Sequence, residues 1–282
     1  MSDAHVRCEV DGAILKLTLD RPDKLNAYTA QMGRELAEAF ERADRDDAIR
    51  VVIVSGSGRA FCAGADISSG AGSFDTKSDN SIAFGKSSER QGRASSFVDA
   101  IFNCRKPSIA AINGPAVGVG ITMTLPMDIR IAADGAKIGF VFARRGLVPE
   151  AGSAWFLPQL VGLPQALSWC LSGRLFEARE ACEKGLVSEV VPPAELEARA
   201  EAIAREIAEN TSAISIALTR QMLWRFSSAP SYHDLLHVDG PLAMELGASP
   251  EVREGVAAFL EKRKPQFPGR VSKDMPSLYP WW

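Results

Sequence analysis

The chain has 282 residues, of which 46% are hydrophobic and 24% are charged, and its net charge at pH 7 is −3. This is the composition of an ordinary globular protein, and without a basic excess it argues against a nucleic-acid partner. The five cysteines are scattered, and neither a signal peptide nor a membrane span is expected, which indicates a cytoplasmic protein with reduced thiols and no membrane partner.

Strand and helix patterns alternate up to about residue 192. Apolar runs predict strands at 13–20, 50–58, 108–114, 128–134 and 136–140, and apolar residues at helical spacing predict an amphipathic helix over 29–47 that Thr29 opens. The Gly- and Ser-rich stretch at 68–91 predicts a long loop of the kind that serves as a lid or binding loop. Together these patterns predict α/β architecture with mostly buried strands.

After Pro192 the strand signals stop. Helices are predicted at 193–209, 212–227 and 249–264, and an irregular, proline-rich tail is predicted at 265–282. In "HDLLH", His233 and His237 lie four residues apart, a spacing similar to that of the zinc motif H-E-x-x-H. The intervening acid is the shorter aspartate and a third ligand is missing, so we expect no bound metal and favour two polar residues on an amphipathic helix.

The stretch "NGPAVGVGITMTLPMDI" (113–129) is a glycine-punctuated turn that runs into an apolar helix. Gly114, Gly118 and Gly120 let the backbone approach a ligand closely, and the first amides of the helix point outward without partners. These features indicate an anion or oxyanion site. Nothing in the stretch can act as a general acid or base, so proton transfer requires a residue from elsewhere in the chain.

A second glycine-containing loop, "RAFCAGADI" (59–67), follows the strand predicted at 50–58. Ala63, Gly64 and Ala65 again permit close backbone approach, although a simple tight turn explains this loop equally well when it is taken alone. Two such loops at the ends of strands in one sheet could each offer one N–H to the same oxygen. That arrangement is the minimal oxyanion hole.

The segment "GLVPEAGSAWFLPQLVG" (146–162) carries Pro149 and Glu150 directly before a helical run. The simplest interpretation is a helix start, because proline suits the first turn and a carboxylate is favoured near the positive end of the helix dipole. Walker, G-x-G-x-x-G and G-x-S-x-G motifs are missing, which disfavours a nucleotide cofactor and a serine nucleophile of the α/β-hydrolase type.

These loops, together with "LDRPDKLNAYTAQM", "KPSIAAING", "SGRLFEAREACEKGLVSEVVP" and "REGVAAFLEKRKPQF", resemble the crotonase family, also called the enoyl-CoA hydratase/isomerase superfamily. The resemblance covers about residues 5–268. It implies a spiral core of ββα turns with the CoA and active sites at 1–195, a helical trimerisation region at 196–268, and an irregular tail at 269–282. It also implies an acyl-CoA thioester substrate, no separate cofactor, and a homotrimer or a dimer of trimers.

By position, the resemblance implies that the backbone amides of Ala65 and Val119 hold the thioester oxygen. Val119 stands where the family usually has glycine, but only its N–H is needed. The remaining substrate or CoA contacts that the resemblance implies are Lys24, Leu25, Ala27, Ala63, Asp66, Ile67, Gly118, Thr122, Phe142 and Trp155.

Thr122 and Phe142 occupy the positions of the two glutamates that hydratases of this family use to activate water. Glu150 instead falls where some Δ3,Δ2-enoyl-CoA isomerases of the family carry their single catalytic carboxylate. The resemblance therefore favours an isomerase. The alternatives are a hydratase, another crotonase reaction such as thioester hydrolysis or ring modification, and a non-catalytic acyl-CoA-binding protein in which Glu150 only begins a helix.

Overall fold

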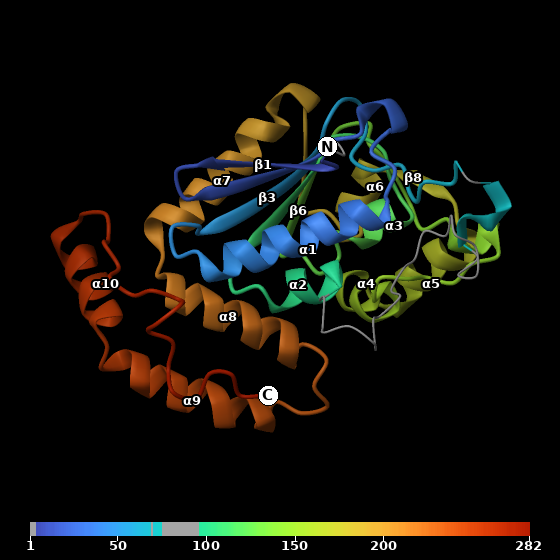
Figure 1. Cartoon of the computed structure of the whole chain (residues 1–282). Coiled ribbons are helices and arrows are strands. Elements are labelled where there is room, and N and C mark those ends of the chain that lie inside the picture. The colour runs from blue at the N-terminus through green and yellow to red at the C-terminus, as the bar shows by residue number, and fades with distance from the viewer. Residues whose placement is uncertain (1–3, 69, 75–95) are drawn as a thin grey trace.

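The computed structural model describes residues 4–68, 70–74 and 96–282, and Figure 1 shows how its elements are arranged. Apart from Ser68 and a short 3-10 helix (Gly70–Phe74), the loop predicted at 68–91 lies outside the described residues. The main sheet has six strands in the order β1-β2-β3-β4-β6-β9. They are β1 (Val6–Asp11), β2 (Ile14–Leu19), β3 (Val51–Gly56), β4 (Ser108–Ile112), β6 (Ile129–Ala133) and β9 (Glu189–Val191).

All strand pairs in this sheet are parallel except β1 and β2, which run antiparallel. In β3 the side chains of Val52 and Val54 join the core beneath α1 (Ala30–Arg45), whereas Val51 and Ile53 face α7 (Leu196–Asn210). Because both faces are covered, as Figure 1 shows, the strand is apolar at each of these positions. The predicted α/β architecture is confirmed, and α7, the first helix of the segment 196–268, packs on the sheet.

A second, three-stranded sheet contains β5 (Ala116–Val117), β7 (Lys137–Gly139) and β8 (Leu175–Glu177). Strand β7 lies parallel to β5 and antiparallel to β8. Isolated parallel bridges join Cys62 to Ala116 and Tyr28 to Ala65. These contacts bring the chain segments after β2, β3 and β4 together, where the site described below is formed.

Thr29 begins α1 as predicted, and its hydroxyl accepts a hydrogen bond from the Met32 N–H at 3.1 Å. The helix α2 (Phe97–Asn103) packs beside α1, and three further helices follow β7 along the chain. They are α4 (Ser153–Val161), α5 (Leu163–Ser172) and α6 (Ala178–Glu183). The sequence patterns did not single out α2, α5 or α6.

The apolar helix predicted after the 113–120 turn is wrong in extent, because α3 spans only Val119–Thr122. The chain then turns through residues 123–127, where the Leu125 N–H donates to the Thr122 carbonyl at 3.1 Å. Pro126 has no N–H to continue a helical ladder, and the Thr124 hydroxyl donates to the Ile121 carbonyl at 2.8 Å. The apolar pattern there arises from burial within the core and not from helical periodicity.

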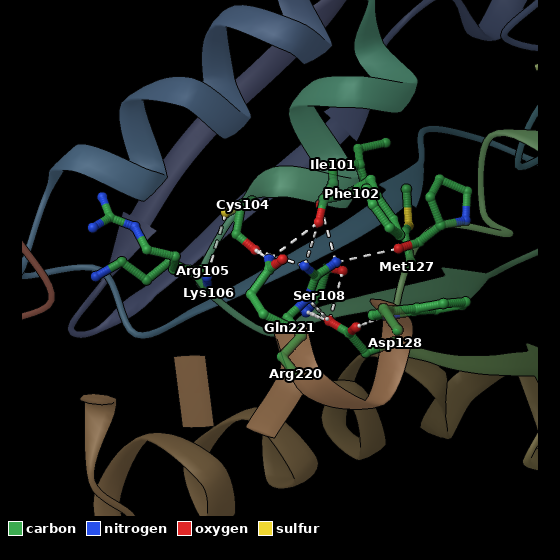
Figure 2. A network of polar contacts seen from close by, with 12 residues as sticks. Ile101, Phe102, Cys104, Arg105, Lys106, Ser108, Met127, Asp128, Arg220 and Gln221 are labelled. Carbon is green, nitrogen blue, oxygen red and sulfur yellow. Dashed lines mark hydrogen bonds and ion pairs between the residues drawn. The ribbon is translucent and has the colours of Figure 1, made fainter. Parts of the chain in front are cut away.

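The C-terminal helices are α8 (Ala213–Phe226), α9 (His233–Gly247) and α10 (Pro250–Glu261), and α9 and α10 project away from the sheet (Figure 1). Figure 2 shows how the buried Arg220 of α8 is fixed to the core. Its guanidinium pairs with Asp128 at 2.9 Å and donates to the carbonyl oxygens of Ile101, Phe102, Cys104 and Pro126. As predicted, the tail from residue 265 contains neither a helix nor a strand.

Candidate active site

The two glycine loops lie against each other. The Cys62 N–H donates to the Pro115 carbonyl and the Val117 N–H donates to the Cys62 carbonyl, each at 3.0 Å. A Cβ on Gly120 would lie 2.0 Å from the Cys62 carbonyl oxygen, so no side chain fits at this position. The glycine allows α3 to begin directly beside the loop that follows β3.

Each loop presents a backbone N–H directly after a glycine with positive φ. Gly64 has a φ of +114° and precedes Ala65, and Gly118 has a φ of +55° and precedes Val119. Within the described residues, the N–H groups of Ala65 and Val119 have no hydrogen-bond partner. Val119 is the first residue of α3, where no intrahelical partner exists. Two unpaired donors on touching loops can bind one oxygen atom.

Glu150 lies in a tight turn and contacts Thr122, the last residue of α3. Ala151 and Gly152 both have left-handed backbone conformations, and the Ser153 N–H donates to the Glu150 carbonyl at 3.0 Å. The Thr122 hydroxyl of α3 donates to Glu150 Oε1 at 2.6 Å. The second carboxylate oxygen, Oε2, is buried and has no hydrogen-bond partner.

Burial raises the pKa of Glu150 from its ordinary value to about 7, against the hydrogen bond from Thr122, which lowers it. The charge on Glu150 also raises the pKa values of Tyr28 and Cys62, although burial is the larger cause for both. Tyr28 bridges to Ala65, and Cys62 begins the same loop. The carboxylate therefore lies within electrostatic reach of the loop that carries the Ala65 amide, and it can take up or release a proton near neutral pH.

The segment at 24–27 adjoins the Cys62–Asp66 loop. The Ala63 N–H donates to the Leu25 carbonyl at 3.0 Å, and the Ala27 N–H donates to the Lys24 carbonyl at 3.0 Å. Asn26, which was not expected from the sequence, joins these segments: its fully buried side chain donates to the carbonyls of Ser57 and Ala60. Its only sequence signal is a polar residue within a turn.

The Asp66 carboxylate is bound by other groups of the protein. Burial opposes ionisation of its carboxyl group, but hydrogen bonds from Ser68 and the adjacent Arg21 guanidinium hold its pKa at about 2. Arg21 pairs with Asp66 at 2.9 Å and also donates to the Ala27 carbonyl at 2.6 Å. The ion pair thus fastens the segment at 24–27 to the loop after β3.

Three other residues predicted to contact the substrate or CoA, Phe142, Ile67 and Trp155, differ in their exposure and surroundings. Phe142 is buried and presents no polar side-chain group, whereas Ile67 is exposed. The Trp155 ring packs edge-to-face on Phe102 and Phe156, and it borders a hollow of about 980 Å³ that Trp281 and Trp282 also line. The structure therefore places Trp155 in an aromatic cluster at the C-terminal tail.

No cluster of three or more His, Cys, Asp or Glu side chains that could hold a metal ion occurs in the part of the chain that the structure describes. His233 and His237 are both exposed on α9. Among the described helices, none combines the length and apolar character that crossing a membrane requires.

A profile of the family described as "Enoyl-CoA hydratase/isomerase" matches residues 9–270. The chain belongs to the enoyl-CoA hydratase/isomerase family. It is 40% identical over 272 residues to the enoyl-CoA hydratase ACTT3 of Alternaria alternata, covering 94% of this chain and 88% of that protein. It is 34% identical over 264 residues to the 1,2-epoxyphenylacetyl-CoA isomerase of Escherichia coli, covering 93% of this chain and 97% of that protein.

The fold of this family member agrees with that of a solved relative. A probable enoyl-CoA hydratase/isomerase from Mycobacterium abscessus superimposes with a TM-score of 0.84 at 32% identity, covering 94% of this chain and 99% of that one. The protein is therefore an acyl-CoA enzyme of the enoyl-CoA hydratase/isomerase family with the crotonase-like fold. The relatives' names include both hydratases and an isomerase.

Proposed function

We propose that this family member is a Δ3,Δ2-enoyl-CoA isomerase in which Glu150 is the single proton shuttle. The observation that carries the proposal is one buried carboxylate, with a pKa of about 7, beside the loops that present two unpaired amides. Thr122 and Phe142 supply no carboxylate at the positions where the resemblance places the hydratase glutamates.

In this reaction the ionised Glu150 removes a proton from C2 of a 3-enoyl thioester. The electrons move onto the thioester oxygen, where the N–H groups of Ala65 and Val119 stabilise the dienolate. The protonated Glu150 then returns the proton to C4, and the double bond lies between C2 and C3. The hydrogen bond from Thr122 holds Oε1, which leaves Oε2 free for the proton transfer.

The CoA moiety lies, in this proposal, against the segments at 24–27 and 63–67. Lys24 is exposed and supplies a cation there, while Leu25, Ala27, Ala63 and Ile67 supply backbone and apolar surface. This placement of CoA is supported by the hydrogen bond between Ala63 and Leu25, which joins the two segments next to the Ala65 amide. Asp66 contributes by holding Arg21 and does not need to contact CoA.

We also propose that the protein assembles as a trimer through its C-terminal helices. Met244 of α9 and Phe259 of α10 are 81% and 82% exposed, and Leu236 and Leu260 are also exposed. Large apolar residues on projecting helices favour association, because burying them removes apolar area from water.

The test of the isomerase proposal is a comparison of the wild type with Glu150→Gln. Purified protein is supplied with 3-enoyl-CoA esters of several chain lengths, and formation of the conjugated 2-enoyl thioester is followed. We expect isomerisation by the wild type and its loss in the variant, with CoA affinity retained. A wild type that isomerises no chain length would transfer the assignment to another crotonase reaction or to acyl-CoA binding alone.

A further inference from the structure

A buried lysine ammonium group far from Glu150 in the sequence has no partner. Lys106 lies between α2 and β4 and is 2% exposed, and its Nζ makes neither a hydrogen bond nor an ion pair within the part of the chain that the structure describes. Figure 2 shows its side chain pointing away from the Arg220 network. A buried cation without a counter-group is costly, so its presence indicates an anion that supplies the missing acceptors.

Lys106 lines a cavity of about 380 Å³ in which positive charge predominates. Arg50 and Arg270 also line this cavity, whereas Asp47 is the one acidic residue among those that line it. Among the described residues, the Arg50 side chain makes a single hydrogen bond, from Nη2 to the Thr211 carbonyl at 2.7 Å, and the Arg270 side chain makes none. The lining residues carry an excess of two positive charges, which a doubly charged anion would neutralise.

The carboxylates near the cavity are bound by other groups. Asp47 accepts hydrogen bonds from the hydroxyl and the N–H of Ser272, the latter at 3.0 Å, and Glu251 accepts one from the Gly269 N–H at 2.7 Å and does not line the cavity. Burial lowers the pKa of Lys106 below its ordinary value, against the charge of Asp47, which raises it from beyond ion-pair distance. The protein itself therefore leaves this ammonium group uncompensated.

A helix terminus adds to the positive field. Ala213, the first residue of α8, lines the same cavity, and its N–H has no intrahelical partner. Arg50 and Lys106 precede the parallel strands β3 and β4, whereas the loops with the Ala65 and Val119 amides follow the carboxyl ends of these strands. The cavity therefore lies at the opposite edge of the sheet from the candidate active site.

We propose that this cavity is a second ligand site, which binds a phosphate group between the side chains of Lys106, Arg50 and Arg270. The phosphate is either the free ion or the monoester group of a nucleotide, because both present the same doubly charged oxygen cluster to these cations. This site is separate from the chemistry of Glu150 and does not rest on the proposed isomerase function.

The position of the site predicts what the anion does. Arg105 donates to the Val271 carbonyl at 2.9 Å, which already joins the C-terminal segment at 268–272 to the turn before β4. A phosphate bound between Lys106 and Arg270 links the same two segments. We therefore expect it to stabilise the folded protein, because a ligand that binds only the folded state shifts the unfolding equilibrium.

The experiment compares the wild type with Lys106→Met, Arg270→Gln and Lys184→Met. Lys106→Met replaces a buried unpaired charge by an apolar side chain and should preserve the fold. Lys184 is exposed at the end of α6 and controls for the loss of one lysine charge. Inorganic phosphate, AMP and malonate are titrated by calorimetry at an ionic strength kept constant with chloride, and thermal unfolding is followed with and without phosphate.

We expect the wild type to bind phosphate, Lys106→Met to bind it roughly 10- to 100-fold more weakly, and Arg270→Gln roughly 2- to 5-fold more weakly. Lys184→Met should bind as the wild type does. Phosphate should raise the unfolding temperature of the wild type and not that of Lys106→Met.

The three ligands also separate the sources of the anion. Binding that depends on Lys106 and is tighter for AMP than for inorganic phosphate identifies a nucleotide as the ligand, and the reverse order identifies the free ion. No effect of phosphate beyond that of chloride, or unchanged phosphate binding by Lys106→Met, would overturn the inference. A site that depends on Lys106 but prefers malonate would overturn its assignment to phosphate.

Discussion

At the scale of single residues, the chemistry of Glu150 depends on two opposing effects. Burial disfavours the carboxylate and raises its pKa to about 7, whereas the Thr122 hydroxyl stabilises the ionised form. The titratable groups that face it, Tyr28 and Cys62, have raised pKa values and are neutral at pH 7, so neither pairs with its charge. The balance leaves a base that is partly ionised at neutral pH.

The pH dependence of the reaction should report the titration of Glu150. In the proposed reaction the ionised form is the base, so we expect kcat/KM for isomerisation to increase as pH rises through about 7 and then to level off. Glu150→Gln should lower kcat by roughly 10²- to 10⁴-fold. Initial rates between pH 5 and 9 test both statements. A flat wild-type profile across pH 7 would assign the rate-limiting proton transfer to another group.

The same burial makes Glu150 a pH-dependent cost to stability. A folded-state pKa of about 7, raised from 4.5, means that the protein has no penalty below the unfolded value and loses stability as pH rises towards 7. At about 1.4 kcal/mol per unit, the penalty above pH 7 is about 3–4 kcal/mol. Glu150→Gln should therefore be more stable than the wild type by about this amount at pH 8, and nearly equal to it at pH 4.5. Urea unfolding at the two pH values measures the difference.

At the scale of elements, the site depends on loops whose backbones approach closely. Gly64 and Gly118 have positive φ values and direct the following N–H groups away from their own chain, and Gly120 admits the Cys62 carbonyl. None of these contacts uses a side chain. Under the proposed function, we therefore expect the positions of Ala65 and Val119 to tolerate side-chain changes but not loss of the N–H.

Replacement of Val119 by proline separates these effects. Proline is compatible with the first position of a helix but has no N–H, so Val119→Pro should lower kcat by about 10²- to 10³-fold. Val119→Ala retains the N–H and controls for loss of the buried side chain. Steady-state kinetics with both folded variants tests the prediction. Turnover of Val119→Pro equal to that of Val119→Ala would remove this amide from the oxyanion hole.

In the network of Figure 2, Arg220 and Gln221 attach α8 to the core. Arg220→Met removes the cation from Asp128 and the guanidinium that donates to the Ile101 and Pro126 carbonyls, so we expect about 3–5 kcal/mol of destabilisation. Arg199→Ala, which breaks an exposed pair with Glu189, should cost less than about 1 kcal/mol. Denaturant unfolding compares the two variants, and equal small effects would show that the network is not a stabilising anchor.

At the scale of the whole molecule, α9 and α10 extend from the core and carry large exposed apolar side chains (Figure 1). We expect a trimer at micromolar concentration, measured by light scattering. Met244→Glu combined with Phe259→Glu places charges on this surface and should shift the protein towards the monomer, because an unpaired charge is costly to bury. Lys273→Glu on the exposed tail is the control. A wild type that is entirely monomeric would contradict the prediction.

The sequence by itself determined the elements whose signals are local. The apolar run of β3, the cap at Thr29, the glycine loops and the C-terminal helices were predictable, because strand period, helix capping and glycine backbone freedom depend on neighbouring residues. The strand β1 was missed, since only Val6 of its six residues is buried and no alternating pattern results. The length of α3 was overestimated, since a buried turn and a buried helix have the same apolar composition.

Tertiary structure alone decided the chemistry of the candidate site. Thr122 and Glu150 are 28 positions apart, and only the packing of α3 against the 150–153 turn makes their hydrogen bond. The pKa of Glu150 follows from burial among residues of several segments, which no local pattern encodes. The unpartnered state of Ser153 Oγ is likewise a property of the assembled core. The sequence specifies which residues are present, whereas the burial of Glu150 and Ser153 and their distances to other groups are set only when segments far apart in the chain pack together.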